Sequence, residues 1–436
     1  MNNKTAVVIG GGLAGVEAAK QLSKRGVKVT LYEMKPRKFS PAHKSEKLAE
    51  LVCSNSLKAE RIGSAAGLLK AEMSLFGSVC VEAAYKAKVP AGGALAVDRD
   101  AFSDEITRSI ENDENITLIR EEITEIPSEG IVIIAAGPLM SDSLAQKVGE
   151  LCGKDFLSFY DAAAPIVTAD SIDMENAFTQ SRYDRGGEDD YINCPLDKAQ
   201  YEEFYEELIN AESAELHSFD KRKDVYEGCM PIEVLASRGK DAMRYGPLKP
   251  VGLTNPKTGH RPWANLQLRK ENKDGTMYNL VGFQTNLKFP EQKRVFSMFP
   301  ALKNAEFVRY GVMHRNTFLN SPGLLSYDFS LKKEPRIYFA GQISGVEGYM
   351  ESASSGILAG YNAARRLFGE EPILLPKITM MGALSQYISD ETVKNFQPMG
   401  AAFGIIDPLP DRIKDKKERY ETLANRSLDY FKTIKI

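Results

Sequence analysis

The chain has 436 residues, of which 43% are hydrophobic and 26% charged, and its formal net charge at pH 7 is −3. This is an ordinary globular composition with enough length for two or three domains. The charge argues against a protein that coats nucleic acid generally, although a local basic surface is compatible with it. No apolar stretch approaches the roughly 20 residues of a membrane span, and the first residues leave no room for a secretion signal. A soluble, cytoplasmic protein is expected.

The first predicted element is a strand, a turn and a helix. An apolar run at 7–9 is followed by Gly10, Gly12 and Gly15 in G-x-G-x-x-G spacing, and apolar residues then recur at helical intervals. Gly10 permits a tight turn, Gly12 lets the backbone approach a pyrophosphate, and Gly15 allows the helix to pack closely on the strand. The pattern predicts a site for a dinucleotide.

A second strand at 27–32 completes this βαβ unit. It ends in Glu33, at the distance from the first glycine that a dinucleotide site requires, and a carboxylate there accepts hydrogen bonds from ribose hydroxyls. No second G-x-G-x-x-G occurs, so a dedicated nicotinamide domain is not predicted, and any NAD(P)H would dock elsewhere.

Two later segments repeat the pattern of a strand that ends in glycine, at 130–140 and at 336–369. Each alone is compatible with an ordinary glycine turn, but together with the first unit they resemble the three FAD-contacting segments of the two-dinucleotide-binding flavoproteins. That class usually has Asp where this chain has Gln342. The helix after the last glycine would direct its N-terminus at the flavin ring and stabilise the negative charge of reduced flavin. Cofactor contacts are expected here from Gly137, Gly341, Gln342, Gly348 and Tyr349.

The middle of the chain differs in composition, with an acidic helix around 201–216 and then loops rich in Pro, Lys and Arg. A solvated helix face is the preferred interpretation of the acidic run, because its carboxylates lack convergent His or Cys, and no metal site is expected. The expected fold is α/β: a Rossmann-like FAD-binding domain formed by residues 1–160 and 330–436, the second part including C-terminal helices, with a smaller α+β domain inserted at 161–329.

Several motifs resemble those of flavoproteins that modify uridines in tRNA. The segment "AGQISGVEGYMESASSGILAG" fits two branches, GidA, which acts on the wobble uridine, and TrmFO, the folate- and FAD-dependent tRNA (uracil-5-)-methyltransferases. The motifs "YEMKP", "LVCSNSLK", "VPAGGALAVDRD", "GCMPIEVLASRG" and "MHRNTF" are similar to TrmFO nearly end to end. GidA proteins are longer and carry a C-terminal helical domain, so the TrmFO branch is favoured.

The resemblance implies methylation of carbon 5 of the T-loop uridine of tRNA, position 54, with methylenetetrahydrofolate as carbon donor. It further implies FAD as methylene carrier and reductant, with NAD(P)H as the source of electrons. The expected partners are tRNA, the folate and NAD(P)H, with no membrane and no obligate protein partner. The same chemistry on a ribosomal RNA uridine is an alternative that the sequence separates poorly. A non-catalytic flavin-bearing RNA-binding or redox protein is the alternative outside enzymes.

Carbon 5 of uracil becomes nucleophilic after a thiolate adds to carbon 6, and the resemblance assigns two catalytic thiols, Cys53 and Cys229. Ser54 to Ser56 are expected to cap a helix that continues through Leu68, and Pro231 to open another helix. A helix N-terminus lowers the pKa of a neighbouring thiol. Cys229 is the expected nucleophile and Cys53 the methylene holder or base, although the sequence leaves the reverse assignment open. The remaining cysteines, which are expected to pack in the core, are Cys80, Cys152 and Cys194.

Folate binding is expected from His314, Arg315 and Asn316 in the motif "MHRNTF", since imidazole can stack on a pteridine and Arg can pair with a carboxylate. An ordinary, partly buried loop histidine is the alternative. A run of cations interspersed with Tyr245 and Trp263 predicts an RNA surface of phosphate contacts and stacking, with a merely solvated face as the alternative. The expected RNA contacts are Arg238, Lys240, Arg244 and Arg261, and Lys249 and Arg269 belong to the same run.

Overall fold

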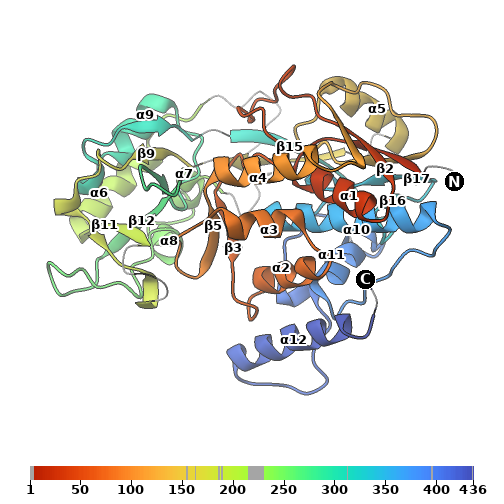
Figure 1. Ribbon diagram of the computed structural model, residues 1–436. Coiled ribbons are helices and arrows are strands. Elements are labelled where there is room, and N and C mark those ends of the chain that lie inside the picture. The colour runs from red at the N-terminus through yellow and green to blue at the C-terminus, as the bar shows by residue number, and fades with distance from the viewer. Residues whose placement is uncertain are drawn as a thin grey trace.

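The computed structural model describes residues 4–153, 156–162, 164–184, 187, 190–214, 230–311, 313–393, 396–434 and 436. Within these residues the chain forms two six-stranded sheets and two smaller ones. The second six-stranded sheet, with its helices, gathers at one end of the molecule in Figure 1, and the first sheet lies toward the other end. No helix in the described part of the chain is long and apolar enough to cross a membrane.

The first sheet has the strand order β16-β17-β7-β1-β2-β6. All its pairs are parallel except β16 with β17. Every residue of β7 is buried, as expected for an inner strand that is covered on both faces. The sheet joins early and late parts of the chain and confirms the predicted Rossmann-like fold. Its strands are β1 (Thr5–Ile9), β2 (Lys28–Tyr32), β6 (Ile116–Ile119), β7 (Ile131–Ile134), β16 (Ser330–Leu331) and β17 (Glu334–Phe339).

Helices α1 (Leu13–Lys24) and α10 (Tyr349–Leu367) pack against each other at very short range (Figure 1). A Cβ atom added at Gly356 of α10 would lie only 2.1 Å from the carbonyl oxygen of Ala14 in α1, so only glycine permits this approach. The contact brings the N-termini of both helices to the same sheet edge. The other helices of this part are α2 (Ala65–Leu75), α3 (Val79–Lys86), α4 (Arg99–Glu111), α5 (Asp142–Cys152), α11 (Met380–Ser389) and α12 (Lys416–Phe431).

The second sheet is antiparallel, with strand order β10-β11-β12-β13-β9-β14. Aromatic rings fill its core: Phe283 lies 5.1 Å from Phe296 and 5.7 Å from Phe299 between ring centroids. Its strands are β9 (Ile166–Thr168), β10 (Phe178–Thr179), β11 (Tyr191–Leu196), β12 (Ala264–Lys270), β13 (Met277–Leu280) and β14 (Phe307–Arg309). Its helices are α6 (Lys198–Ile209), α7 (Ile232–Ala236), α8 (Ala242–Tyr245) and α9 (Phe289–Phe296).

Helix α6 is the predicted acidic helix, and it packs on the second sheet through Tyr201, Phe204 and Leu208, which are all buried. Its carboxylates lie on the other face of the helix, as the solvated-face interpretation predicts. Among the residues that the structure describes, no group of three or more His, Cys, Asp or Glu side chains could hold a metal ion.

Two smaller sheets connect these parts. The antiparallel ribbon of β8 (Phe156–Ala162) and β15 (Met313–Leu319) lies where the chain passes between the two large sheets, and its register pairs His314 with Asp161. The domain borders at 160 and 329 remain predictions. The other small sheet has the order β3-β5-β4, and its strands are β3 (Ser56–Ala59), β4 (Lys88–Val89) and β5 (Ala94–Val97). The 3-10 helices are η1 (Met174–Asn176), η2 (Arg182–Asp184), η4 (Pro300–Leu302), η5 (Gln342–Ser344) and η6 (Phe403–Ile405).

The prediction of a helix directly after Cys53 is wrong. Residues 56–59 form β3, and α2 begins only at Ala65, where the Ser64 side chain caps the helix. The reason is tertiary, because the Asn55 amide donates to the carbonyl oxygens of Val97 at 3.0 Å and Lys270 at 2.9 Å. These bonds hold the chain extended beside β5. The hydroxyls of Ser54 and Ser56 instead accept from the N–H groups two residues further along the chain.

Candidate active site

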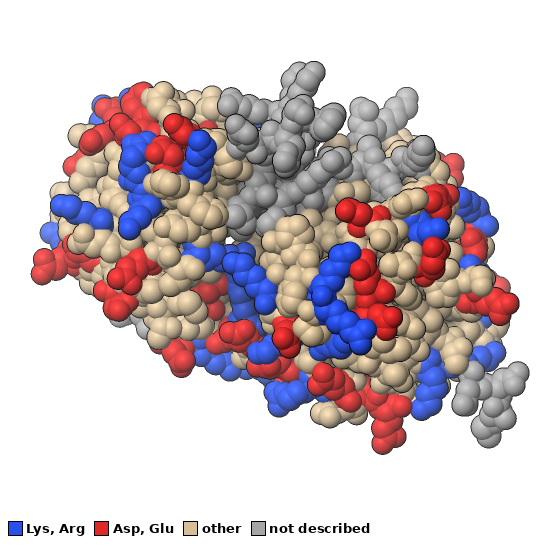
Figure 2. Space-filling model, turned by 90° about the horizontal axis from the view of Figure 1, so that it is seen from above, with Lys and Arg blue, Asp and Glu red and all other residues tan. Residues whose placement is uncertain are grey.

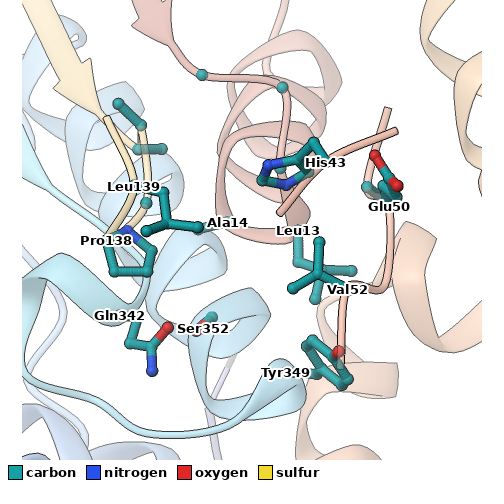
Figure 3. A pocket seen from close by; sticks show the side chains of 18 of the residues that line it. Leu13, Ala14, His43, Glu50, Val52, Pro138, Leu139, Gln342, Tyr349 and Ser352 are labelled. Atoms are coloured by element: carbon teal, nitrogen blue, oxygen red, sulfur yellow. The ribbon is translucent and has the colours of Figure 1, made fainter. Parts of the chain in front are cut away.

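A cavity of about 430 Å³ opens where the carboxyl ends of β1, β2 and β7 meet the N-termini of α1 and α10. In the view of Figure 3, Pro138 and Leu139 border it on one side and His43 and Glu50 on the other. The edge of a parallel sheet at which strand order reverses is the usual place for a ligand. Most of the residues that the sequence assigned to the cofactor line this cavity: Gly10, Gly12, Glu33, Gly137, Gly341, Gln342, Gly348 and Tyr349. Gly15 is not among the lining residues.

The three glycines of the first turn have different surroundings. Gly10 has φ +106°, and a Cβ atom there would lie 2.5 Å from the carbonyl oxygen of Ala135. A Cβ atom at Gly15 would lie 1.8 Å from the carbonyl oxygen of Gly10, whereas a Cβ atom at Gly12 would meet nothing within 4 Å. Gly10 and Gly15 are therefore required by the packing of the chain itself. Gly12 leaves open space at the cavity wall that a ligand can fill.

The helix N-termini at the cavity suit anionic groups. Gly12 caps α1 and Gly348 caps α10, and neither helix has a side-chain hydrogen bond at its N-cap. The first N–H groups of each helix are thus available to a ligand, and the helix dipole adds partial positive charge. A pyrophosphate fits the start of α1, and the anionic ring of a reduced flavin fits the start of α10.

Glu33 has the position of a ribose-binding carboxylate. Its side chain is buried, and its two oxygens accept hydrogen bonds from the backbone N–H groups of Gly11 at 2.8 Å and Lys35 at 3.0 Å. These bonds orient the carboxylate while each oxygen keeps a lone pair for a hydroxyl donor. The Gln342 amide donates to the Glu347 carboxylate at 2.6 Å, so the residue that departs from the usual Asp is itself held in place. The donor and acceptor set fits FAD.

Cys53 lies half-buried in the cavity wall, in contact with Tyr349 at the start of α10. The Cys53 N–H donates to the Tyr349 hydroxyl oxygen at 2.8 Å, and the Cys53 Sγ lies 2.9 Å from the same oxygen. Burial, and then the neighbouring Cys53, raise the pKa of Tyr349, so the phenol remains protonated and can donate to a thiolate. Because no helix begins directly after Cys53, the predicted effect of such a helix on the thiol is absent, and the neighbours of the thiol are Tyr349 at the start of α10 and nearby cations.

Arg269 was assigned to the RNA-contacting run of cations, and this assignment is wrong. The side chain is only 6% exposed and donates to Asn55 Oδ1 and Ser54 Oγ, each at 3.0 Å. Asn265, Gln267 and Arg269 alternate with apolar residues along β12, a pattern that predicts a strand but not the observed burial of its polar face. Sequence reasoning also missed Arg99 and Arg309, which bond the same loop.

The four residues assigned to RNA belong to the part of the molecule that the second six-stranded sheet and its helices form, away from the sheet that borders the cavity. Arg238, Lys240 and Arg261 are exposed, and Lys240 pairs with Glu202 at 3.1 Å. The Arg244 guanidinium stacks 3.9 Å from the centre of the Trp263 ring. Across the face in Figure 2, cations and anions are interspersed.

Some predicted residues lie outside the described part of the chain. Cys229 is one of them, and the helix that follows it, α7, has Pro231 as its N-cap residue. Of His314, Arg315 and Asn316 the structure describes the backbone, in β15. The packing role predicted for the other three cysteines is confirmed, because Cys80, Cys152 and Cys194 are all buried. Burial raises the pKa of the Cys80 and Cys194 thiols.

The parallel sheet, the glycine-rich strand ends and the carboxylate after β2 define a FAD-binding fold of the Rossmann type. The model of the family described as glucose inhibited division protein A matches residues 5–371. Among solved structures, Aquifex aeolicus GidA in its form II crystal superposes with a TM-score of 0.70 at 17% identity, covering 99% of this chain and 73% of that one. At this identity the likeness shows the fold alone.

Curated relatives are much more similar in sequence. A protein of Acetivibrio thermocellus is 59% identical over 98% of this chain and 97% of its own length. One of Ligilactobacillus salivarius is 56% identical over 98% of both chains. Both are named methylenetetrahydrofolate–tRNA-(uracil-5-)-methyltransferase TrmFO. The chain belongs to the TrmFO family of methyltransferases, which confirms the resemblance seen in its motifs.

Proposed function

We propose that the chain methylates carbon 5 of the T-loop uridine of tRNA, uridine 54, with methylenetetrahydrofolate as the one-carbon donor. The relatives' shared name supports a tRNA uracil as substrate and the folate as donor. The observation that carries the proposal is the position of Cys53, a half-buried thiol in the wall of the cavity that fits FAD. When bound, FAD would carry the one-carbon unit and supply the reducing electrons, and NAD(P)H would reduce the flavin again.

The chain's own residues would hold the cofactor at three places. The turn at 10–12 and the start of α1 receive the pyrophosphate, and Glu33 accepts from a ribose hydroxyl. The start of α10 faces the flavin ring and stabilises its negative charge. Since Tyr349 begins α10 and contacts Cys53, a flavin ring bound at the start of this helix would lie near the thiol.

The two thiols have separate roles in this proposal. Addition of the Cys229 thiolate to carbon 6 of uracil forms a C–S bond and makes carbon 5 an enolate-like nucleophile. After carbon 5 has bonded to the one-carbon unit, a base must remove its proton before the C–S bond breaks. Cys53 is assigned as that base or as the holder of the methylene, because its loop adjoins the cofactor turn and its thiol contacts Tyr349.

Folate binding is assigned by the same resemblance, and RNA binding by the run of cations with aromatic residues between them. His314, Arg315 and Asn316 would bind the pteridine and the folate carboxylate, from the ribbon between the two large sheets. The exposed cations Arg238, Lys240 and Arg261, with Arg244 stacked on an indole ring, would contact RNA phosphates and bases.

A covalent trap tests the assignment of the thiols. A T-arm hairpin with 5-fluorouracil at the target cannot lose fluorine as a proton, so attack leaves the RNA attached to the nucleophile. After incubation with methylenetetrahydrofolate and reductant, peptide mapping should find the RNA on Cys229, and Cys229→Ala should abolish the adduct. The buried control Cys152→Ala should retain it. Attachment to Cys53 would show that the roles are reversed, and attachment to neither thiol would refute the mechanism.

The choice of RNA is tested separately, by mass analysis of tRNA and ribosomal RNA from a strain that lacks this chain. The proposal expects 5-methyluridine to disappear from the T-loop of tRNA while ribosomal RNA stays unchanged. Loss from ribosomal RNA alone would contradict the proposed substrate and leave the chemistry intact.

A further inference from the structure

Two guanidinium groups bond consecutive carbonyl oxygens of the loop at 51–55, which carries Cys53. Arg99 lies at the start of α4, beside the first sheet, whereas Arg309 is the last residue of β14 in the second sheet. The acceptors are the carbonyl oxygens of Leu51 and Cys53 for Arg99, the latter at 3.2 Å, and of Val52 for Arg309. The backbone at Cys53 and just before it is therefore held by one cation from α4 and one from the second sheet.

A third guanidinium fixes the residues that follow Cys53. Arg269 of β12 donates to Ser54 Oγ and Asn55 Oδ1, both at 3.0 Å. On the other side of the loop, the N–H groups of Cys53 and Ser54 point to the Tyr349 hydroxyl oxygen, at 2.8 and 3.3 Å. The loop is held between three arginines and one phenol, and its side chain at position 53 remains in the cavity wall.

The charges around the loop are unbalanced. Glu271 is the carboxylate that bonds Arg99, and its second oxygen is buried with no hydrogen-bond partner among the described residues. Burial, followed by the charge of Arg99, lowers the pKa of Arg309, while Tyr349, Glu271 and Cys53 oppose this decrease. Burial also lowers the pKa of Arg99, but Glu271, Tyr349 and Cys53 together raise it above its ordinary value.

The electrostatic partner that these cations lack is an anion at Cys53. Glu271 is paired with Arg99, and its charge also acts on Arg269 and Arg309. Buried cations are stabilised by a nearby negative charge. Among the described residues, the groups that act on the thiol include Tyr349 of α10, Arg99 of α4 and Arg309 of β14. Lys58 and Glu351 of the same cavity are paired with each other at 2.7 Å. A thiolate at position 53 would be attracted by the two arginines and would accept a hydrogen bond from the phenol.

We propose that Arg99, Arg269 and Arg309 form a clamp that positions Cys53 at the cavity and holds it as a thiolate. The proposal rests on the proposed function only in giving Cys53 a reactive role. The three arginines are positioning residues, since they act through the loop. Two of them belong to the second sheet, so the clamp also makes the state of the thiol depend on how that sheet sits against the cavity.

The test measures how fast iodoacetamide alkylates Cys53 between pH 6 and 10 in the FAD-loaded protein, with peptide mass mapping to separate Cys53 from the other thiols. Arg309→Gln, which keeps a donor and loses the charge, should shift the midpoint of the Cys53 profile upward by about one pH unit. Arg309→Lys should remain near the wild type. The matched control is Arg182→Gln. Arg182 also donates to backbone carbonyl oxygens, those of Lys249 and Val251, and these lie outside the loop at 51–55.

An unchanged Cys53 profile in Arg309→Gln, with normal FAD content, would overturn the proposal and leave the arginines a structural role only. An equal shift in Arg182→Gln would also overturn it, because the effect would then be general. If Arg309→Gln does not fold, Arg269→Gln is measured in the same way and decides by the same comparison. Alkylation needs neither tRNA nor folate, so failure of the proposed methylation would not affect this test.

Discussion

Replacing Gly12 by Ala should separate cofactor binding from folding. Gly12 has φ −76° and ψ −174°, a conformation that alanine adopts freely, and a Cβ atom there would meet nothing within 4 Å. The added methyl group would stand in the cavity beside the start of α1, where a pyrophosphate must approach the backbone. The matched variant is Gly15→Ala, whose Cβ atom would lie 1.8 Å from the carbonyl oxygen of Gly10.

The two variants should differ in what they destabilise. Gly12→Ala should cost the apoprotein about 0.5 to 1 kcal/mol, because alanine is a poorer N-cap residue than glycine. It should weaken FAD binding by about 10- to 100-fold, or roughly 1.4 to 2.8 kcal/mol. Gly15→Ala requires α1 to move away from β1 by more than about 1 Å, and overpacking of this kind costs about 1 to 3 kcal/mol of folding stability.

Urea denaturation of the apoproteins measures the first quantity, and FAD titration followed by flavin fluorescence measures the second. Gly12→Ala should have a nearly unchanged denaturation midpoint and a higher Kd for FAD. If Gly12→Ala binds FAD as tightly as the wild type, the pyrophosphate does not lie at this turn. If it loses as much stability as Gly15→Ala, the space beside Gly12 is not open as described.

Three further outcomes are expected. Burial raises the pKa of Glu72 from 4.5 to about 7. The stabilising contribution of this group is therefore complete below pH 4.5 and is lost as the pH rises through 7. Relative to Glu72→Gln, the stability of the wild type in urea should fall by on the order of 3 kcal/mol from pH 4.5 to 8. Charge reversal at Arg238 and Lys240 should reduce the slope of log affinity for tRNA against log salt by about 1 to 2, and an unchanged slope would make these cations a solvated surface. His314→Ala should weaken the use of methylenetetrahydrofolate while FAD content stays normal, and unchanged folate dependence would remove His314 from the site.

The cofactor part of the site was predictable because its signals are local. The turn at 10–15, its strands and Glu33 lie within one βαβ unit, so the spacing of its glycines is visible in a short stretch of sequence. The later strand ends at Gly137 and Gly341 follow the same rule, because parallel strands end at one edge of the sheet.

The surroundings of Cys53 were not predictable in the same way. Three serine and asparagine residues after a cysteine suit a helix cap or a turn equally well, and only the contact of Asn55 with β5 and β12 decides between them. The arginines that hold the loop come from positions 99, 269 and 309, so no window of sequence shows them together. Arg269 was placed on the surface because its sequence neighbours are surface cations.

The most direct test of the central claim follows the transferred carbon. Purified FAD-loaded protein is incubated with an unmodified tRNA transcript, NADH and methylenetetrahydrofolate that carries ¹³C in its methylene group, and the RNA is then mapped by mass spectrometry. The account predicts one ¹³C-labelled 5-methyluridine in the T-loop, its loss in Cys53→Ala and its retention in the buried-thiol control Cys152→Ala. An unlabelled T-loop uridine, label in a different nucleotide, or full activity of Cys53→Ala would contradict the account.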